Sequence, residues 1–242
     1  GARLHVLHLS TARELSLLEA GPVSGKKITG EACVAHLLFS QADYRTLGTL
    51  IKCNPAVKTK ADRDALRRAV NEDVIDVIAT DHAPHSEEDK LKGMAGMVGS
   101  ETAFGVCYTK LCKQEGLPLE LLVHLMSTRP AEILGLAKGQ LEPGFDADFV
   151  LVDLDTPYTV EKEKLHSKSH NTPFDGVELY GKVCATIKGG KITAEVLEKA
   201  LKKFVEEIEK AQKQARQPKT YRGKQSIKHL VQQNAAINNI EV

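Results

Sequence analysis

The stretch that decides the fold is Val-Ile-Asp-Val-Ile-Ala-Thr-Asp-His-Ala-Pro-His, residues 74–85. Its apolar first half is typical of a buried strand, and Asp81 stands where that strand ends. His82 and His85 follow in the loop beyond. A parallel α/β barrel holds a metal ion and activates water at its C-terminal mouth with strands that end in this way. The stretch therefore predicts an α/β fold with a metal-dependent site.

Strand-like and helix-like segments alternate on both sides of this stretch. Residues 4–9 and 27–33 predict two more strands, and residues 12–20 and 62–71 predict helices between the strands. Further helices are expected at residues 101–115, 118–127 and 130–136. Strands that alternate with helices indicate a parallel sheet or barrel.

The character of the chain changes twice after the last of these helices. Residues 1–138 form the predicted α/β part, and residues 139–192 predict a small β module with strands at 147–152 and 183–188. Residues 193–242 predict a helical, basic, Gln/Asn-rich appendage, in which Thr193 caps a long helix that ends near residue 214.

Composition narrows the function classes. The 242 residues carry a formal net charge of +1, which argues against nucleic acid as a partner. No apolar run approaches the roughly 20 residues that span a bilayer. The five cysteines are odd in number and have no Cys-x-x-Cys spacing, which favours reduced thiols and a cytoplasmic location.

Two further polar residues stand at the ends of predicted strands. His8 ends the first strand, and Glu31 lies at the end of the second. A lone strand histidine is more often a hydrogen-bonded core residue, and a lone Glu is as often an ion-paired loop residue. Because Asp81 ends a third parallel strand, His8 and Asp81 together make a metal site the favoured interpretation. His5 and His36 are expected to be structural.

The loops carry three candidates for binding a polar substrate. Asn54 precedes a proline, which favours an extended loop conformation. His85 can reach a substrate anion, and the Gly-rich loop of residues 93–100 offers backbone N–H groups, Gly99 among them, to a carboxylate. Alone, Asn54 would more often be a turn residue.

The chain resembles the second half of dihydroorotase, a cyclic amidohydrolase. The matching passages run in order over roughly residues 2–192, and they are residues 5–11, 30–38, 52–57, 76–85, 99–102, 129–136, 144–148 and 171–174. The resemblance implies the C-terminal portion of a TIM-type (β/α)8 metal-dependent hydrolase barrel, with its last three strands, and part of a small β domain. The C-terminal helix of residues 193–242 lies outside the family's pattern.

The resemblance also implies roles for these residues. His8 matches the metal ligand of the sixth barrel strand, and Asp81 matches the aspartate after the eighth, which binds metal and transfers the proton. Glu31 matches a glutamate that some members use for an additional zinc, so one or two Zn²⁺ ions are expected. Asn54, His85 and the Gly99 backbone match positions that hold the ring and its carboxylate. The implied reaction is reversible hydrolysis of dihydroorotate to N-carbamoyl-aspartate in pyrimidine biosynthesis.

The departures from the family are as informative as the matches. The His-x-His pair of the first strand, the carboxylated Lys or Asp of the fourth and the His of the fifth have no counterpart, and Ala35 replaces one of two paired histidines. Three barrel strands leave open edges. We therefore expect this chain to be inactive alone and to need a complementing N-terminal half or a homo-oligomer. The alternative is a catalytically dead amidohydrolase-like scaffold or partner-binding subunit.

Overall fold

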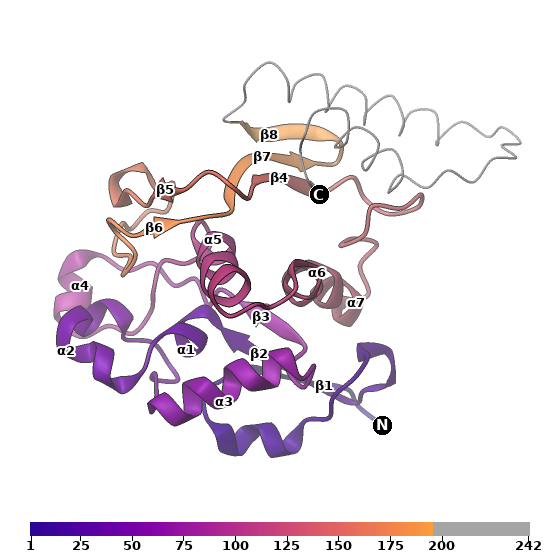
Figure 1. Ribbon diagram of the computed structural model, residues 1–242, viewed down its shortest axis with the longest axis horizontal. Coiled ribbons are helices and arrows are strands. Elements are labelled where there is room, and N and C mark those ends of the chain that lie inside the picture. Colours follow the sequence, from indigo (N-terminus) through magenta and orange to yellow (C-terminus); the bar gives the residue numbers. More distant parts are fainter. Residues whose placement is uncertain (196–242) are drawn as a thin grey trace, which may run out of the picture. The chain divides into compact units, whose positions relative to one another are not determined.

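The computed structural model describes residues 1–195 (Figure 1). The chain forms two compact units. The first comprises Gly1–Leu134 and Asp153–Lys182, and the second comprises Gly135–Val152 and continues from Val183. Residues 153–182, which the sequence analysis placed in the β module, group instead with the first unit. The reason is that Val160, Phe174 and Leu179 are buried in its hydrophobic core.

A parallel sheet of three strands organises the first unit. The strands are β1 (Leu4–Leu9), β2 (Ile28–Cys33) and β3 (Val77–Ala79), in the order β1-β2-β3. Leu4 pairs with Ile28, and Ala32 pairs with Ile78. The three predicted strands are confirmed. The register shifts between Val6 and Leu9, so an irregularity lies where His8 stands.

Helices fill the connections between the strands and follow the sheet. The elements are η1 (Ala12–Leu17), η2 (Val23–Gly25), α1 (Val34–Leu38), η3 (Gln41–Asp43), α2 (Tyr44–Leu47), η4 (Gly48–Ile51), α3 (Lys60–Asn71), α4 (Glu87–Leu91), α5 (Ala103–Cys107), η5 (Tyr108–Gln114), α6 (Leu119–Val123), η6 (His124–Thr128), α7 (Arg129–Leu134) and η7 (Lys162–Lys164). The helices predicted after residue 100 are present, but η5 and η6 have π-helical pitch. No helix in the described part of the chain is long and apolar enough to cross a bilayer.

The two faces of β2 have different surroundings. Successive strand residues point to opposite faces, so Gly30 and Ala32 share one face while Thr29 and Glu31 share the other. A Cβ on Gly30 would lie 2.7 Å from Leu18 Cδ1, so this face is closed by apolar side chains. The opposite face is polar at Thr29 and Glu31.

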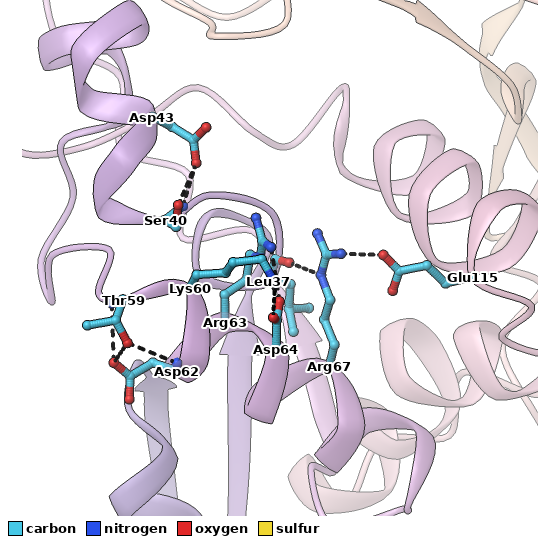
Figure 2. A network of polar contacts seen from close by, with 10 residues as sticks. All are labelled: Leu37, Ser40, Asp43, Thr59, Lys60, Asp62, Arg63, Asp64, Arg67 and Glu115. Atoms are coloured by element: carbon cyan, nitrogen blue, oxygen red, sulfur yellow. Dashed lines mark hydrogen bonds and ion pairs between the residues drawn. The ribbon is translucent and has the colours of Figure 1, made fainter.

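Helix α3 is fixed in place by polar contacts along its length (Figure 2). Thr59 and Asp62 form a capping box at its first turn, which satisfies two backbone N–H groups that the helix leaves unpaired. Arg67 donates from Nε to the Leu37 carbonyl at the end of α1 and pairs with Glu115 after η5. The guanidinium therefore joins three helical segments, and its burial lowers the pKa of Arg67.

The amino end of the sheet contains a buried ion pair. Lys26 Nζ lies 2.6 Å from Asp76 Oδ1, and the two side chains are 6% and 0% exposed. The second carboxylate oxygen accepts the Gly30 N–H at 2.9 Å. Asp76 directly precedes β3, and its side chain thus links the start of β3 to β2 and to the loop before β2.

Both edges of this sheet are open within residues 1–195, because β1 and β3 each have one strand neighbour. Leu4 and Leu7 on β1 are both 56% exposed, and Ile28 on β2 is 40% exposed. Parallel strands are normally buried on both faces. The sheet therefore shows the open edges expected of a partial barrel.

The second unit is built on a sheet of three strands, of which the last two pair antiparallel. Its strands are β4 (Phe149–Asp153), β7 (Lys182–Lys188) and β8 (Lys191–Glu195), in the order β4-β7-β8. The strands β5 (Tyr158–Thr159) and β6 (Glu178–Leu179) pair separately in the first unit. Thr193 lies inside β8 and donates from Oγ1 to the Thr186 carbonyl at 3.2 Å, so the prediction that it caps a helix is wrong. The Gly189-Gly190 turn connects β7 to β8, and the two strands pair antiparallel. The rest of the predicted C-terminal helix lies outside the described residues.

Candidate functional site

His8 and Asp81 both lie toward the carboxyl ends of parallel strands of the sheet. His8 lies near the carboxyl end of β1, Asp81 lies just beyond the carboxyl end of β3, and β2 runs between them. Both have left-handed backbone conformations, with φ of 40° and 47°. Asp73, with φ of 61°, is the third non-glycine residue with positive φ between residues 1 and 195. Such conformations are uncommon for side-chain-bearing residues and gather at functional sites.

The side chains of His8 and Asp81 share a second property. Within the described residues, neither the His8 imidazole nor the Asp81 carboxylate makes a hydrogen bond or an ion pair, although both residues are only partly exposed. Partly buried polar groups are usually paired in folded proteins. The two residues that the sequence analysis singled out as metal ligands therefore combine an uncommon backbone conformation with a side chain that has no partner in the described structure.

Glu31 stands between them on β2, but its carboxylate is already engaged. One oxygen accepts the backbone N–H of His8 at 3.3 Å. The other lies 3.3 Å from His5 Nε2, and His5 Nδ1 lies 2.8 Å from Thr29 Oγ1. Glu31 therefore braces the irregular part of β1 against β2. Its role as a metal ligand stays a prediction, whereas His5 has the structural contacts expected of it.

His36, in α1, is a buried histidine whose surroundings bear on the candidate site. It is 2% exposed, its Nε2 lies 2.7 Å from the Pro55 carbonyl, and its Nδ1 has no partner in the described structure. Burial lowers the pKa of His36, while the Asp81 carboxylate raises it and the His8 imidazole lowers it. The Asp81 carboxylate and the His8 imidazole therefore both influence the pKa of this buried imidazole.

The predicted substrate-binding residues lie in the loops beyond the sheet. Asn54 is exposed, and within residues 1–195 its side-chain amide makes no hydrogen bond. His85 is partly exposed, and its imidazole also makes no hydrogen bond in that part of the chain. The Gly99 N–H donates to His82 Nδ1 at 3.1 Å. Binding of a substrate through the Gly99 backbone therefore requires His82 to give up this hydrogen bond.

Sequence reasoning missed the residues that hold these loops. Gly96 has φ of 140°, and a Cβ there would lie 2.6 Å from the Ala83 carbonyl and 2.8 Å from His85 Nε2. Ser169 donates to the His85 carbonyl. Lys90 is buried beneath the same loop. The glycine was visible as part of a Gly-rich run, but nothing in the local sequence distinguishes Lys90 from a solvated helix residue.

A cleft of about 240 Å³ opens elsewhere in the first unit and contains none of the predicted site residues. Its cations are largely matched by carboxylates, since Arg63 pairs with Asp64 and Arg67 pairs with Glu115. The lining residues are Leu38, Phe39, Arg63, Arg67, Val106, Lys110, Gln114, Glu115, Phe174, Val177 and Leu179. The unpartnered polar residues at the strand ends are the better candidate site.

The donor set at the strand ends suits a metal ion in kind but not in number. Imidazole nitrogen and carboxylate oxygen are both zinc ligands, and a catalytic zinc site uses three protein ligands. No group of three or more His, Cys, Asp or Glu residues arranged to hold a metal ion occurs among the residues that the structure describes. His8 and Asp81 therefore form part of a metal site at most.

Comparison with known proteins identifies the family. The model of the amidohydrolase family matches residues 11–193. The chain belongs to the amidohydrolase family. This family is generally metal-dependent.

The known relatives of this chain are about twice as long as the segment that matches them. A dihydroorotase of Clostridium botulinum is 43% identical over 194 residues, which cover 79% of this chain and 47% of that protein. The L-hydantoinase (dihydropyrimidinase) of Arthrobacter aurescens is 30% identical with a TM-score of 0.76, and the match covers 82% of this chain and 46% of that chain. The chain thus spans about half the length of the relatives it matches, and it carries part of a TIM-barrel-type α/β fold.

A third similarity concerns the fold alone. The inactive dihydroorotase-like domain of the Chaetomium thermophilum CAD-like multifunctional protein is 24% identical, with a TM-score of 0.60. The match covers 80% of this chain and 51% of that chain. A similar fold therefore occurs in a domain described as inactive.

Proposed function

We propose that this chain supplies the part of a dihydroorotase that carries the proton-transferring aspartate, in the reversible hydrolysis of dihydroorotate to N-carbamoyl-aspartate. The observation that carries the proposal is the pair formed by His8 and Asp81. Both have positive φ, both lie at the carboxyl end of a parallel strand, and neither side chain has a partner within residues 1–195. The 43% identity to a dihydroorotase supports this substrate over other cyclic amides.

Asp81 is the proposed catalytic residue. An ionised carboxylate only accepts hydrogen bonds, and it takes up a proton when it acts as a general base. Because no protein donor occupies its oxygens in the described structure, Asp81 is free to accept a proton from water and to pass it to the ring nitrogen that leaves. Asp76, which has a lysine and a backbone N–H on its oxygens, cannot serve in this way.

Zn²⁺ is the proposed metal ion. His8 and Asp81 would hold it, with Glu31 as an additional ligand if two ions bind, and the remaining ligands would come from outside this chain. When bound, such an ion activates water and polarises the amide carbonyl. The contacts of Glu31 with His5 and with the His8 N–H hold the irregular part of β1 against β2 beneath this point.

The loops supply the proposed substrate contacts. The Asn54 amide offers both a donor and an acceptor to the imide edge of the ring, and His85 faces the carboxylate. The Gly99 N–H would join them after release from His82. The proposed complementing partner is the portion of a dihydroorotase that this chain does not cover, or a second copy that provides an equivalent surface.

The test is reconstitution. The 242-residue chain is co-expressed with the portion of the Clostridium botulinum relative that it does not cover, and the interconversion of dihydroorotate and N-carbamoyl-aspartate is measured with bound zinc. We expect turnover in the mixture and none in the chain alone. Asp81→Asn should abolish turnover in the mixture. The matched control is Asp73→Asn, which changes another aspartate with positive φ but, within residues 1–195, removes only an ion pair with Arg129.

Two results would contradict the proposal. Unchanged turnover in Asp81→Asn would exclude the proposed base. A stable complex that binds neither zinc nor dihydroorotate would favour the alternative, a catalytically inactive scaffold.

A further inference from the structure

Lys90 is a buried lysine without a carboxylate partner. It lies in α4, is 3% exposed, and makes no ion pair within the described residues. Lysine is almost never fully buried unless it is paired, because removing its charge from water is costly. Burial lowers the pKa of Lys90. A residue kept under these conditions must make other strong interactions.

Those interactions are three hydrogen bonds to backbone carbonyls. Lys90 Nζ donates to the carbonyls of Gly96 at 2.6 Å, Met94 at 3.1 Å and Lys52 at 3.2 Å. All three donors of an ammonium group are thereby used. The Gly96 N–H also donates to the Lys52 carbonyl at 2.8 Å. Lys90 therefore joins the loop after η4 to the loop of residues 93–99.

The two joined loops contact the candidate site. Gly96 packs directly against His85, as its excluded Cβ shows. The Met97 carbonyl accepts the Ala83 N–H at 2.8 Å, and the Gly99 N–H reaches His82. Lys52 lies two residues before Asn54 in the sequence. A single ammonium group thus sets the relative positions of the segments that carry Asn54 and His85.

We propose that Lys90 is a positioning residue, which holds the loop of residues 94–99 against the segment of residues 81–85 so that Asn54 and His85 act on one ligand. That Lys90 holds the two segments together concerns the fold of the loops alone. That Asn54 and His85 then act on one ligand rests on the proposed function. Since an aliphatic side chain of similar length fills the same space without donating, Lys90→Met separates the hydrogen bonds from the packing.

The primary experiment is amide hydrogen exchange on the full 242-residue chain. In Lys90→Met we expect exchange at Ala83, Gly96 and Gly99 to accelerate by about tenfold or more, because the loop loses three hydrogen bonds to a charged donor. The amides of α3, residues 60–71, should keep their rates. The matched control is Lys92→Met, two residues along, whose side chain is 66% exposed and, among the residues that the structure describes, pairs only with Glu88.

The second readout is kinetic and uses the reconstituted enzyme. Lys90→Met should raise KM for dihydroorotate more than it lowers kcat, because it disorders binding groups and leaves Asp81 in place. Lys90→Arg, which restores a cationic donor, should recover part of the loss. A residue that only stabilised the fold would lower the apparent kcat through the amount of folded enzyme and would leave KM unchanged.

The outcomes separate the two proposals. Exchange in Lys90→Met that matches the wild-type chain, or that accelerates uniformly over α3 as well, overturns the positioning role. Local acceleration in a chain whose wild-type mixture shows no turnover supports the positioning of the loops and refutes the proposed function. Local acceleration with an unchanged KM refutes the link between Lys90 and the ligand.

Discussion

The two ends of the β1–β2–β3 sheet use similar residues in opposite ways. At the amino end, Asp76 is fully buried and each oxygen accepts a hydrogen bond, one from Lys26 and one from the Gly30 N–H. At the carboxyl end, Asp81 is partly exposed, has φ of 47°, and makes no hydrogen bond in the described part of the chain. The same side chain type thus stabilises the fold at one end and stays available at the other. Strained backbone conformations and unpaired polar side chains are typical of sites where a ligand binds.

The largest expected effect lies at the amino end. Asp76→Asn removes the counter-ion of Lys26 and leaves a buried ammonium uncompensated, so we expect a loss of roughly 3–5 kcal/mol in the free energy of unfolding. Urea denaturation measures it. The control is Asp64→Asn, whose pair with Lys60 is exposed and whose pair with Arg63 is only partly buried, so that they should contribute under about 1 kcal/mol. A loss below 1 kcal/mol for Asp76→Asn would remove the contrast between the two ends.

An intermediate effect comes from His36, beneath the carboxyl end. Its pKa is lowered in the folded chain from the usual 6.5, so the unfolded chain binds more protons as the pH falls through that value. The contribution of His36 to stability is therefore present above pH 6.5 and is lost as the pH falls from there toward its folded-state pKa. The slope contributed by this one group is at most about 1.4 kcal/mol per pH unit.

This pH dependence is measured by denaturation at a series of pH values on both sides of the usual histidine pKa. His36→Gln should flatten the profile, whereas His124→Gln, at an exposed position, should leave it unchanged. A profile for His36→Gln that is parallel to the wild-type profile would show that His36 does not set the acid limit.

The smallest expected effect on stability is that of Asp81→Asn. The substitution removes no hydrogen bond or ion pair within residues 1–195, and asparagine tolerates positive φ well. The free energy of unfolding should therefore change by no more than about 0.5 kcal/mol, although turnover of the reconstituted enzyme should be lost. A destabilisation comparable to that of Asp76→Asn would mean that Asp81 is structural.

The strands and their end residues were predictable, because short apolar runs bounded by polar residues specify parallel strands with little help from distant contacts. His8, Glu31 and Asp81 follow from that, since the ends of parallel strands meet at one edge. Lys90 was not predictable, because its partners are carbonyls in loops without periodicity. Thr193 suits both a helix cap and a strand, and its pairing with β7 decided between them.

The division of the chain was the other feature that sequence reasoning did not reach. Residues 153–182 have short strands like those of the β module, and their local pattern gives no sign of where they pack. Their assignment to the first unit depends on Val160, Phe174 and Leu179 finding space among α1, α5 and η5. Such complementarity is a property of the assembled core.

Because the edge of β1 is open, the free energy of unfolding depends on what the solution contains as well as on the chain. Leu4 and Leu7 are exposed there, and within residues 1–195 the strand has no neighbour along one side. A segment that binds this edge only in the folded state raises the free energy of unfolding by RT ln(1 + [L]/Kd). The midpoint of thermal unfolding then depends on the concentration and affinity of that segment, so a single melting temperature does not characterise this chain.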